Sequence, residues 1–260
     1  MNPTVNEWLN LVFRWAHVIA GVMWIGHLWF FNFVNAQVAK TYDADSKKKV
    51  VPELMPRALY WFRWGAAWTW ITGVLLLGMV YYMGAGLVEA GSTMTPGLGA
   101  AIGIALMVIS FIIYDILWKS PLKNSALGGT IVSLLLLAAV TAYMDRIFEG
   151  RAVFIHIGAI LGTIMASNVW MRIWPAQRKI IAAIAAGQAP DAALVGLAGL
   201  RSKHNTYMSV PLLFMMVSNH FPLVYGSDKG WILALVLVVV GFLLTFWLYQ
   251  KSGSGAPSKY

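Results

Sequence analysis

The sequence of 260 residues contains no cysteine. This absence excludes disulfides, thiolate-held iron–sulfur clusters, a thiol nucleophile and the C-x-x-C-H attachment of c-type haem. Any redox centre must therefore be held by histidine, methionine or other side chains. The first ten residues also lack the basic stretch of a signal peptide, so we interpret the apolar segment after them as a retained helix.

Charged residues are scarce. They make up 11% of the chain, against about 25% in soluble domains, while hydrophobic residues make up 59%. The charges that remain are mostly basic, with 19 lysines and arginines against ten acids, which gives a net charge of +9. This composition is typical of a polytopic membrane protein.

Apolar runs of about 20 residues are long enough to cross the hydrocarbon core as helices. Seven such runs are found, near residues 9–36, 60–84, 98–118, 127–144, 152–174, 206–224 and 230–250. An open chain in lipid must satisfy its own backbone groups, and the alternation of barrel strands is absent. The predicted fold class is all-α, a polytopic integral membrane helical bundle of about seven transmembrane helices.

Basic residues gather in alternate connections, those near residues 40–63, 119–123 and 172–203. The positive-inside rule places these loops in the cytoplasm, the N-terminus outside and the C-terminus inside. The net charge thus reflects topology. We expect membrane lipid around the protein and no nucleic-acid partner.

The chain is predicted to form one transmembrane helical domain over residues 1–250. Two amphipathic helices are expected on the inner membrane surface near residues 176–203. Residues 251–260 have the composition of a flexible tail.

The five histidines are placed at two depths by this topology. His17, His156 and His220 lie near the outer ends of three different spans. His27 lies about 15 Å deeper than His17 by helical rise, and His204 lies at the inner edge of the sixth span.

Neutral imidazoles from facing helices hold a b-type haem without a covalent link. Histidines at one level on separate helices suit this chemistry, so His17, His156 and His220 are candidate iron ligands, and His27 is a candidate at a second haem level. The alternative is that each histidine is a hydrogen-bonding group between helices.

A polar group is also expected near the inner face. Asp115 is the acid that lies within a span, and it either handles protons or forms an i, i+4 pair with Lys119. His204 and Asn205, together with two nearby arginines, either receive a small anionic substrate or anchor the chain to the inner surface. Asp115, His204 and Asn205 are the candidate catalytic residues.

Four motifs resemble the bacterial membrane-bound urate hydroxylase family, the PuuD type, over nearly the whole chain. They are FRWAHVIAGVMWIG, MPRALYWFRWGAAWTWITGVLLLG, FIHIGAILGTIMASNVWMRIWPAQRK and RSKHNTYMSVPLLFMMVSNHFP. The chain stands on family positions at His17, His156, His204, His220, Asp115, Asn168, Asn205 and Asn219.

The resemblance implies an oxidoreductase of the bacterial cytoplasmic (inner) membrane that oxidises urate and passes electrons to a cytochrome c domain outside. That C-terminal domain is absent from this sequence, so we expect a separate cytochrome c or respiratory complex as the partner. Gly65 stands where family members often have an acidic residue, and His27 replaces a small polar residue.

Three functions compete. The leading hypothesis is a membrane oxidoreductase with one or two non-covalent haem b groups, resembling urate hydroxylase. The second is a non-catalytic haem-carrying or structural subunit of a respiratory membrane complex. The third, a transporter or channel for a small anion, lacks the inverted repeats common in transporters.

Overall fold

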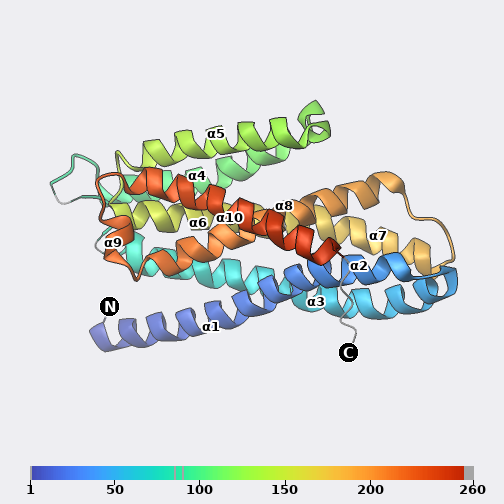
Figure 1. The fold of residues 1–260 in the computed structure, drawn as a ribbon. Coiled ribbons are helices and arrows are strands. Elements are labelled where there is room, and N and C mark those ends of the chain that lie inside the picture. The colour runs from blue at the N-terminus through green and yellow to red at the C-terminus, as the bar shows by residue number, and fades with distance from the viewer. Residues whose placement is uncertain (1, 85, 90, 255–260) are drawn as a thin grey trace. The chain divides into compact units, whose positions relative to one another are not determined.

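The computed structural model describes residues 2–84, 86–89 and 91–254, and every regular element in these ranges is a helix (Figure 1). The main α-helices are α1 (Pro3–Trp29), α3 (Ala44–Leu77), α4 (Pro96–Leu117), α5 (Ala126–Met144), α6 (Gly150–Asn168), α7 (Trp174–Ala185), α8 (Ala192–Ser218) and α10 (Gly230–Gly253). Short α-helices are α2 (Ala36–Val38) and α9 (Pro222–Tyr225); the π-helical segments are η1 (Phe30–Asn35), η3 (Gly78–Tyr82) and η5 (Val169–Ile173); 3₁₀ turns are η2 (Ala39–Thr41) and η4 (Pro121–Asn124). The all-α fold class is confirmed.

Six helical stretches of the described chain are long and apolar enough to cross a membrane. They are Pro3–Thr41, Ala44–Tyr82, Pro96–Leu117, Ala126–Met144, Gly150–Ala185 and Gly230–Gly253. The predicted run at 206–224 falls on α8, which has 27 residues and carries Arg201, Lys203 and His204 before the apolar part. This helix ends at Ser218, because a turn at Asn219 and His220 precedes Pro222. The chain is a multi-pass membrane protein, and its predicted orientation stays a prediction.

Local sequence signals explain where the helices begin. The side chain of Thr95 accepts a hydrogen bond from Leu98 N, and Pro96 is the first residue of α4. Ser125 caps α5 in the same way by accepting from Gly128 N. Such caps satisfy amide groups that have no partner inside the helix.

Three helical stretches are much longer than a membrane requires. Pro3–Thr41 and Ala44–Tyr82 have 39 residues each, and Gly150–Ala185 has 36, which corresponds to about 54–59 Å against roughly 30 Å of hydrocarbon. Each contains one π-helical segment. Such segments widen an α-helix locally and occur frequently at functional sites.

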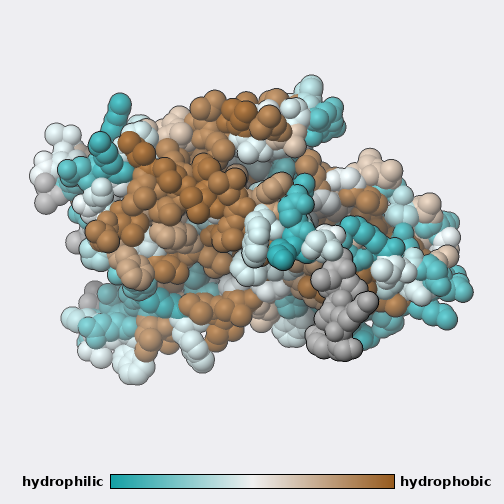
Figure 2. All heavy atoms as spheres, in the orientation of Figure 1, coloured by the Kyte–Doolittle hydropathy of each residue, from teal (hydrophilic) through white to brown (hydrophobic). Residues whose placement is uncertain are grey.

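The chain forms two compact units. Unit 1 comprises residues 1–72, 165–210 and 241–260, and unit 2 comprises residues 73–164 and 211–240. Figure 2 shows hydrophobic side chains gathered over α5 and the first half of α10 in unit 2. The residues concerned include exposed Leu127, Leu135, Ile232 and Val236, as expected for a lipid-facing surface.

In unit 1, α7 and the start of α8 pack on the first half of α3. Their buried residues are Ala176, Ile180, Ile184 and Ala198, against which Val51 and Leu194 pack. Helices are therefore present in the region 176–203, where amphipathic helices are predicted, and they are parts of longer helices. The predicted tail at 251–260 begins inside α10, which reaches Gly253, and its residues 255–260 lie outside the described residues.

Close helix packing in unit 1 depends on Gly65. A Cβ atom at this position would lie 3.0 Å from Trp24 N and 3.3 Å from Ala20 O. The backbones of α1 and α3 therefore approach each other directly at Gly65, as small residues allow in membrane proteins.

Candidate functional site

His156 lies on α6 in unit 2 and is fully buried. Its Nδ1 lies 2.7 Å from Ala152 O. A carbonyl oxygen only accepts hydrogen bonds, so Nδ1 carries the proton and the neutral ring has its lone pair on Nε2. This is the nitrogen that a metal would bind, in an orientation fixed by the backbone.

The lone pair of His156 faces a tyrosine. The hydroxyl of Tyr82, the last residue of η3, lies 3.0 Å from Nε2 and donates to it. The rings of Phe148 and Tyr81 lie 4.8 Å and 6.4 Å from the imidazole ring, between centroids. His156 thus sits in an aromatic surround with one polar group at its free nitrogen.

Gly103 on α4 leaves the space that this pair fills. A Cβ atom at Gly103 would lie 2.7 Å from His156 Nε2 and 2.7 Å from the Tyr82 hydroxyl oxygen. Any larger residue here would displace the imidazole or the phenol. The glycine is therefore part of the site.

A second group of polar side chains in unit 2 adjoins Tyr81. The Tyr81 hydroxyl donates to Asn219 Oδ1, and Asn219 Nδ2 donates to Met215 O. The guanidinium of Arg151 lies 5.6 Å from the Tyr81 ring centroid, and its Nε is buried with no hydrogen-bond partner among the described residues. His220 follows Asn219 in the exposed turn after α8.

The other two candidate haem histidines lie in unit 1. His17 Nδ1 lies 3.1 Å from Thr72 Oγ1, and this hydroxyl lies 2.6 Å from Trp68 O. Because the hydroxyl proton goes to the carbonyl, Thr72 accepts from Nδ1. His27 Nδ1 lies 2.7 Å from Met23 O. Both neutral rings consequently have their lone pair on Nε2, as His156 does.

Buried amides connect helices in unit 1. Asn168 Nδ2 donates to Asn205 Oδ1 at 2.9 Å, and Asn205 Nδ2 donates to Met165 O at 2.9 Å. Both asparagines are fully buried. Asn205, a candidate catalytic residue, is thus held by the protein at both ends of its amide.

Further hydrogen bonds continue this polar region along α8. Asn32 donates to Ser202 Oγ and accepts from the Tyr249 hydroxyl, and Trp29 Nε1 donates to Ser209 Oγ. Arg201 is fully buried on the same helix, and His204 is half-buried. His204 and Asn205 are adjacent in the sequence and lie on α8, the helix that these hydrogen bonds connect to α1, η1 and α10.

Arg63 on α3 is surrounded by aromatic rings. Its guanidinium carbon lies 4.0 Å from the Trp174 centroid and 5.9 Å from that of Trp170, and Trp170 Nε1 donates to Arg63 O. Cation–π contacts of this kind hold an arginine at a membrane-facing surface without an acidic partner. These contacts suit an anchor, and the role of Arg63 as an anchor or as a ligand for an anion stays a prediction.

Asp115 lies in unit 2, whereas His204 and Asn205 lie in unit 1. Its carboxylate is buried and forms an ion pair with Lys119, with Oδ2 and Nζ 2.7 Å apart. The i, i+4 pair expected from the sequence is confirmed. Its proton-handling role stays a prediction.

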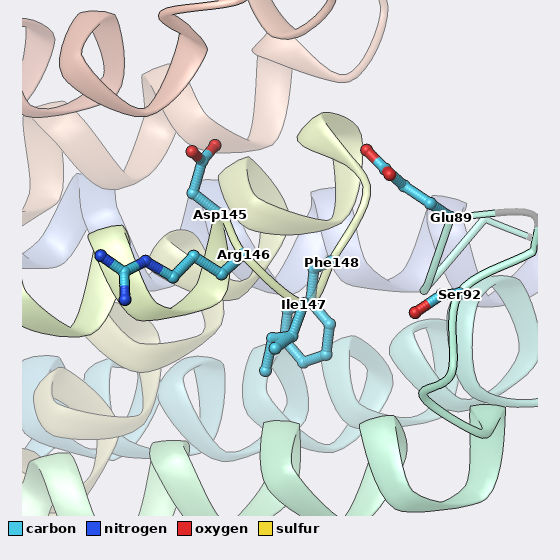
Figure 3. A pocket seen from close by; sticks show the side chains of 6 residues that line it. All are labelled: Glu89, Ser92, Asp145, Arg146, Ile147 and Phe148. Carbon is cyan, nitrogen blue, oxygen red and sulfur yellow. The ribbon is translucent and has the colours of Figure 1, made fainter.

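A small cavity of about 50 Å³ in unit 2 has two acidic residues in its lining. It is lined by Glu89, Ser92, Asp145, Arg146, Ile147 and Phe148. Arg146 extends away from Glu89 (Figure 3). Partial desolvation, and then the negative charge of Glu89, raise the pKa of Asp145 above its usual value.

Sequence reasoning found the histidines and missed the groups that surround them. Tyr82, Tyr81, Gly103 and Arg151 were not singled out, although two successive tyrosines at the end of an apolar run were a visible signal. Within the described part of the chain, no three His, Cys, Asp or Glu side chains gather to hold a bare metal ion. The histidine prediction therefore concerns haem iron, which needs only one or two protein ligands.

Comparisons with known proteins agree with the motifs. The sequence model of the family described as urate oxidase N-terminal matches residues 3–49 and 41–258. The comparison with curated proteins found no match, and the comparison with solved structures found none either.

Proposed function

The chain belongs to the urate oxidase N-terminal family, and from this premise we propose that it is a haem b-binding membrane oxidoreductase. It oxidises a small anionic substrate such as urate and passes electrons to a separate cytochrome c or respiratory complex outside the cytoplasmic (inner) membrane of a bacterium. The observation that carries the proposal is the state of His17, His27 and His156. Each has Nδ1 bound to an oxygen and Nε2 left as the basic nitrogen.

One imidazole of unit 2 supports the haem proposal. His156 supplies an oriented neutral ring, although its Nε2 and the Tyr82 hydroxyl fill the space beside Gly103. Haem propionates are anions, and Arg151 offers a guanidinium whose buried Nε has no hydrogen-bond partner in the described residues. We expect His156 to hold the iron, with His220 of the same unit as a second ligand. His27 would serve a second haem if two are present, and His17 stays a candidate ligand.

When bound, the haem would take electrons from the substrate one at a time and deliver them to the acceptor. The backbone carbonyl of Ala152 keeps the His156 imidazole in the tautomer that ligates iron, and Thr72 does the same for His17. Phe148 and Tyr81 surround His156 and exclude water. Exclusion of water favours the less charged iron state and so tunes the reduction potential.

The polar region of unit 1 supports a substrate role. Urate is a flat anion with alternating N–H and C=O groups along its edge. Donors and acceptors on η1, α8 and α10 meet here, and the buried Arg201 precedes Ser202 on α8. We propose that His204 and Arg201 contact the anion and that Asn205 positions them. Asp115 lies in unit 2, and its proton-handling role is a separate proposal.

The first test is a spectrum of the purified protein, reduced with dithionite, together with a pyridine haemochrome count. We expect a b-type signal at one or two haems per chain, and a lower count in His156→Ala and His17→Ala. His204→Ala is the matched control, since it should keep the full haem content and lose urate oxidation. An apoprotein after expression with ample haem would refute the proposal.

Gly65 favours a second candidate, a non-catalytic haem-carrying or structural subunit. Its packing against the backbone of α1 leaves no room for the acidic residue that many family members have there. Urate turnover by the isolated, haem-loaded protein with added cytochrome c decides between the two. Turnover excludes the subunit role, and full haem without turnover supports it.

A further inference from the structure

The exposed side of α7 in unit 1 carries a basic hollow of about 370 Å³. This volume is within the range of roughly 300–1,000 Å³ that ligand sites occupy. The residues that line the hollow are all exposed, and they are Pro175, Arg178, Lys179 and Ala182. The opposite side of the same helix forms the apolar core with α3. The proposed oxidoreductase function uses none of the four lining residues.

The sequence before α7 places this hollow just beyond the hydrocarbon core. Residues 152–171 contain no Lys, Arg, Asp or Glu, and a helical stretch of about 20 residues crosses roughly 30 Å of hydrocarbon. Met171 ends this stretch and is 54% exposed, as suits a residue that faces acyl chains. Arg178 lies about 10 Å further along the helix. Helical side chains tilt towards the N-terminus, which for α7 is the end at the membrane, so the basic groups reach the level of the lipid phosphates.

No acid balances the positive charge of the hollow. Residues 150–190 contain neither Asp nor Glu. Within the described part of the chain, neither Arg178 nor Lys179 forms an ion pair. The hollow therefore presents two cations and two small apolar side chains, a combination that suits an anion attached to an apolar group.

A second arginine lies close to the hollow. The guanidinium carbons of Arg63 and Arg178 lie 4.0 Å and 5.9 Å from the ring centroid of Trp174. Two like charges at one ring repel each other, and Arg63 Nε is buried with no hydrogen-bond partner among the described residues. An anion beside Arg178 would offset this repulsion. Trp174 itself suits the membrane interface, where tryptophan is enriched.

We propose that the hollow on α7 binds the headgroup of an anionic phospholipid. Arg178 donates to two phosphate oxygens, Lys179 adds a compact positive charge, and Met171 contacts the acyl chain. The predicted orientation places α7 at the cytoplasmic leaflet, whose anionic lipids attract basic segments beside spanning helices. Charge complementarity and the apolar surface at Met171 together favour a lipid over a soluble anion. The inference does not depend on haem.

Native mass spectrometry of the full chain in detergent, titrated with phosphatidylglycerol, tests this site. We expect phosphatidylglycerol to bind more tightly than phosphatidylcholine, and the double variant Arg178→Gln, Lys179→Gln to bind it roughly 10- to 30-fold more weakly. The matched control is Lys47→Gln, Lys49→Gln, which removes two exposed lysines of α3 outside the hollow. Its affinity should stay within about 2-fold of that of the unaltered protein. Equal losses in both double variants would show a diffuse effect of net charge and overturn the site.

A single substitution on the same helix locates the lipid more closely. Ala182→Asp puts a carboxylate into the hollow and should weaken the binding of phosphatidylglycerol, whereas Ala185→Asp makes the same change at an exposed position outside it. Equal affinities of these two variants would contradict binding in the hollow. Inorganic phosphate at the concentration of the lipid should not displace it. Displacement by phosphate would mean that the hollow takes a free anion, and the lipid assignment would be wrong.

Discussion

The two units bury their polar side chains in different ways. In unit 1, Asn168 and Asn205 bond to each other and to the backbone across two helices. In unit 2, the free nitrogen of His156 meets one hydroxyl at a helix end. Hydrogen bonds between buried amides on two helices rigidify a core, whereas the pair of His156 and Tyr82 joins one helix to a helix end. The comparison assigns a structural role to the amides, and ligand binding by the imidazole stays a prediction.

Glycines show the same contrast. Gly65 in unit 1 lets two helix backbones approach, since a Cβ there would meet Trp24 N and Ala20 O. Gly103 in unit 2 makes room for the ends of two side chains, His156 and Tyr82. Backbone atoms cannot move aside without shifting a helix, while side-chain ends can. Substitution should therefore damage folding at Gly65 and ligand binding at Gly103.

The largest effect is expected for Gly65→Val. The new side chain would force α1 and α3 apart, at a cost of about 3 kcal/mol in the free energy of unfolding. The matched control is Gly26→Val, because nothing lies within 4 Å of a Cβ at Gly26. Thermal unfolding in detergent would measure both. Equal melting temperatures for the two variants would mean that close helix contact at Gly65 does not stabilise unit 1.

A pair of identical substitutions compares the two units directly. Asn205→Ala leaves the buried Asn168 amide without its acceptor and should cost about 2 kcal/mol. Asn219→Ala removes one acceptor from Tyr81 at a half-exposed site and should cost about 1 kcal/mol. Thermal unfolding gives the order. The reverse order would contradict the view that unit 1 contains the rigid network.

The sequence predicted the helices well, because each segment that crosses the lipid must by itself be long and apolar enough. Runs such as 98–118 and 127–144 lie within one or two residues of α4 and α5, since length and hydropathy are local properties. The predicted end of the sixth span was wrong, because the turn at Asn219 and His220 ends α8 before Pro222.

The site was only half visible in the sequence. The histidines could be found, because a polar residue in an apolar run is conspicuous. Their partners could not, since Tyr82 and Gly103 lie 74 and 53 residues before His156. The π-helical segment η3, which brings Tyr81 and Tyr82 to the imidazole ring of His156, also cannot be predicted from the hydropathy of the sequence. Tertiary packing determines such pairs, and one sequence does not contain that information locally.

Charged groups in unit 2 should matter less than the amides of unit 1. Lys119→Met removes the ion pair with Asp115, but Lys119 is 56% exposed. The carboxylate of Asp115 is buried, so we expect a loss of about 1 kcal/mol, more than for a fully exposed pair, and a smaller loss in high salt. Lys123→Met, on the adjacent turn, is the control. If Lys119→Met lost more free energy of unfolding than Asn205→Ala, the ion pair and not the amides would be the main polar contribution to stability.

The smallest effect is a pH dependence at the cavity of Glu89 and Asp145. Partial desolvation and the charge of Glu89 raise the pKa of Asp145 in the folded state. The folded protein then binds a proton more tightly than the unfolded chain, so this group adds stability as pH falls from neutral through the raised pKa towards 3.8. Asp145→Asn should melt slightly higher than the unaltered protein at pH 7, and this difference should disappear near pH 4. Glu89→Gln should reduce the same pH dependence, because it removes the repelling charge. A lower melting temperature for Asp145→Asn at pH 7 would instead show that the ionised carboxylate is a needed hydrogen-bond acceptor.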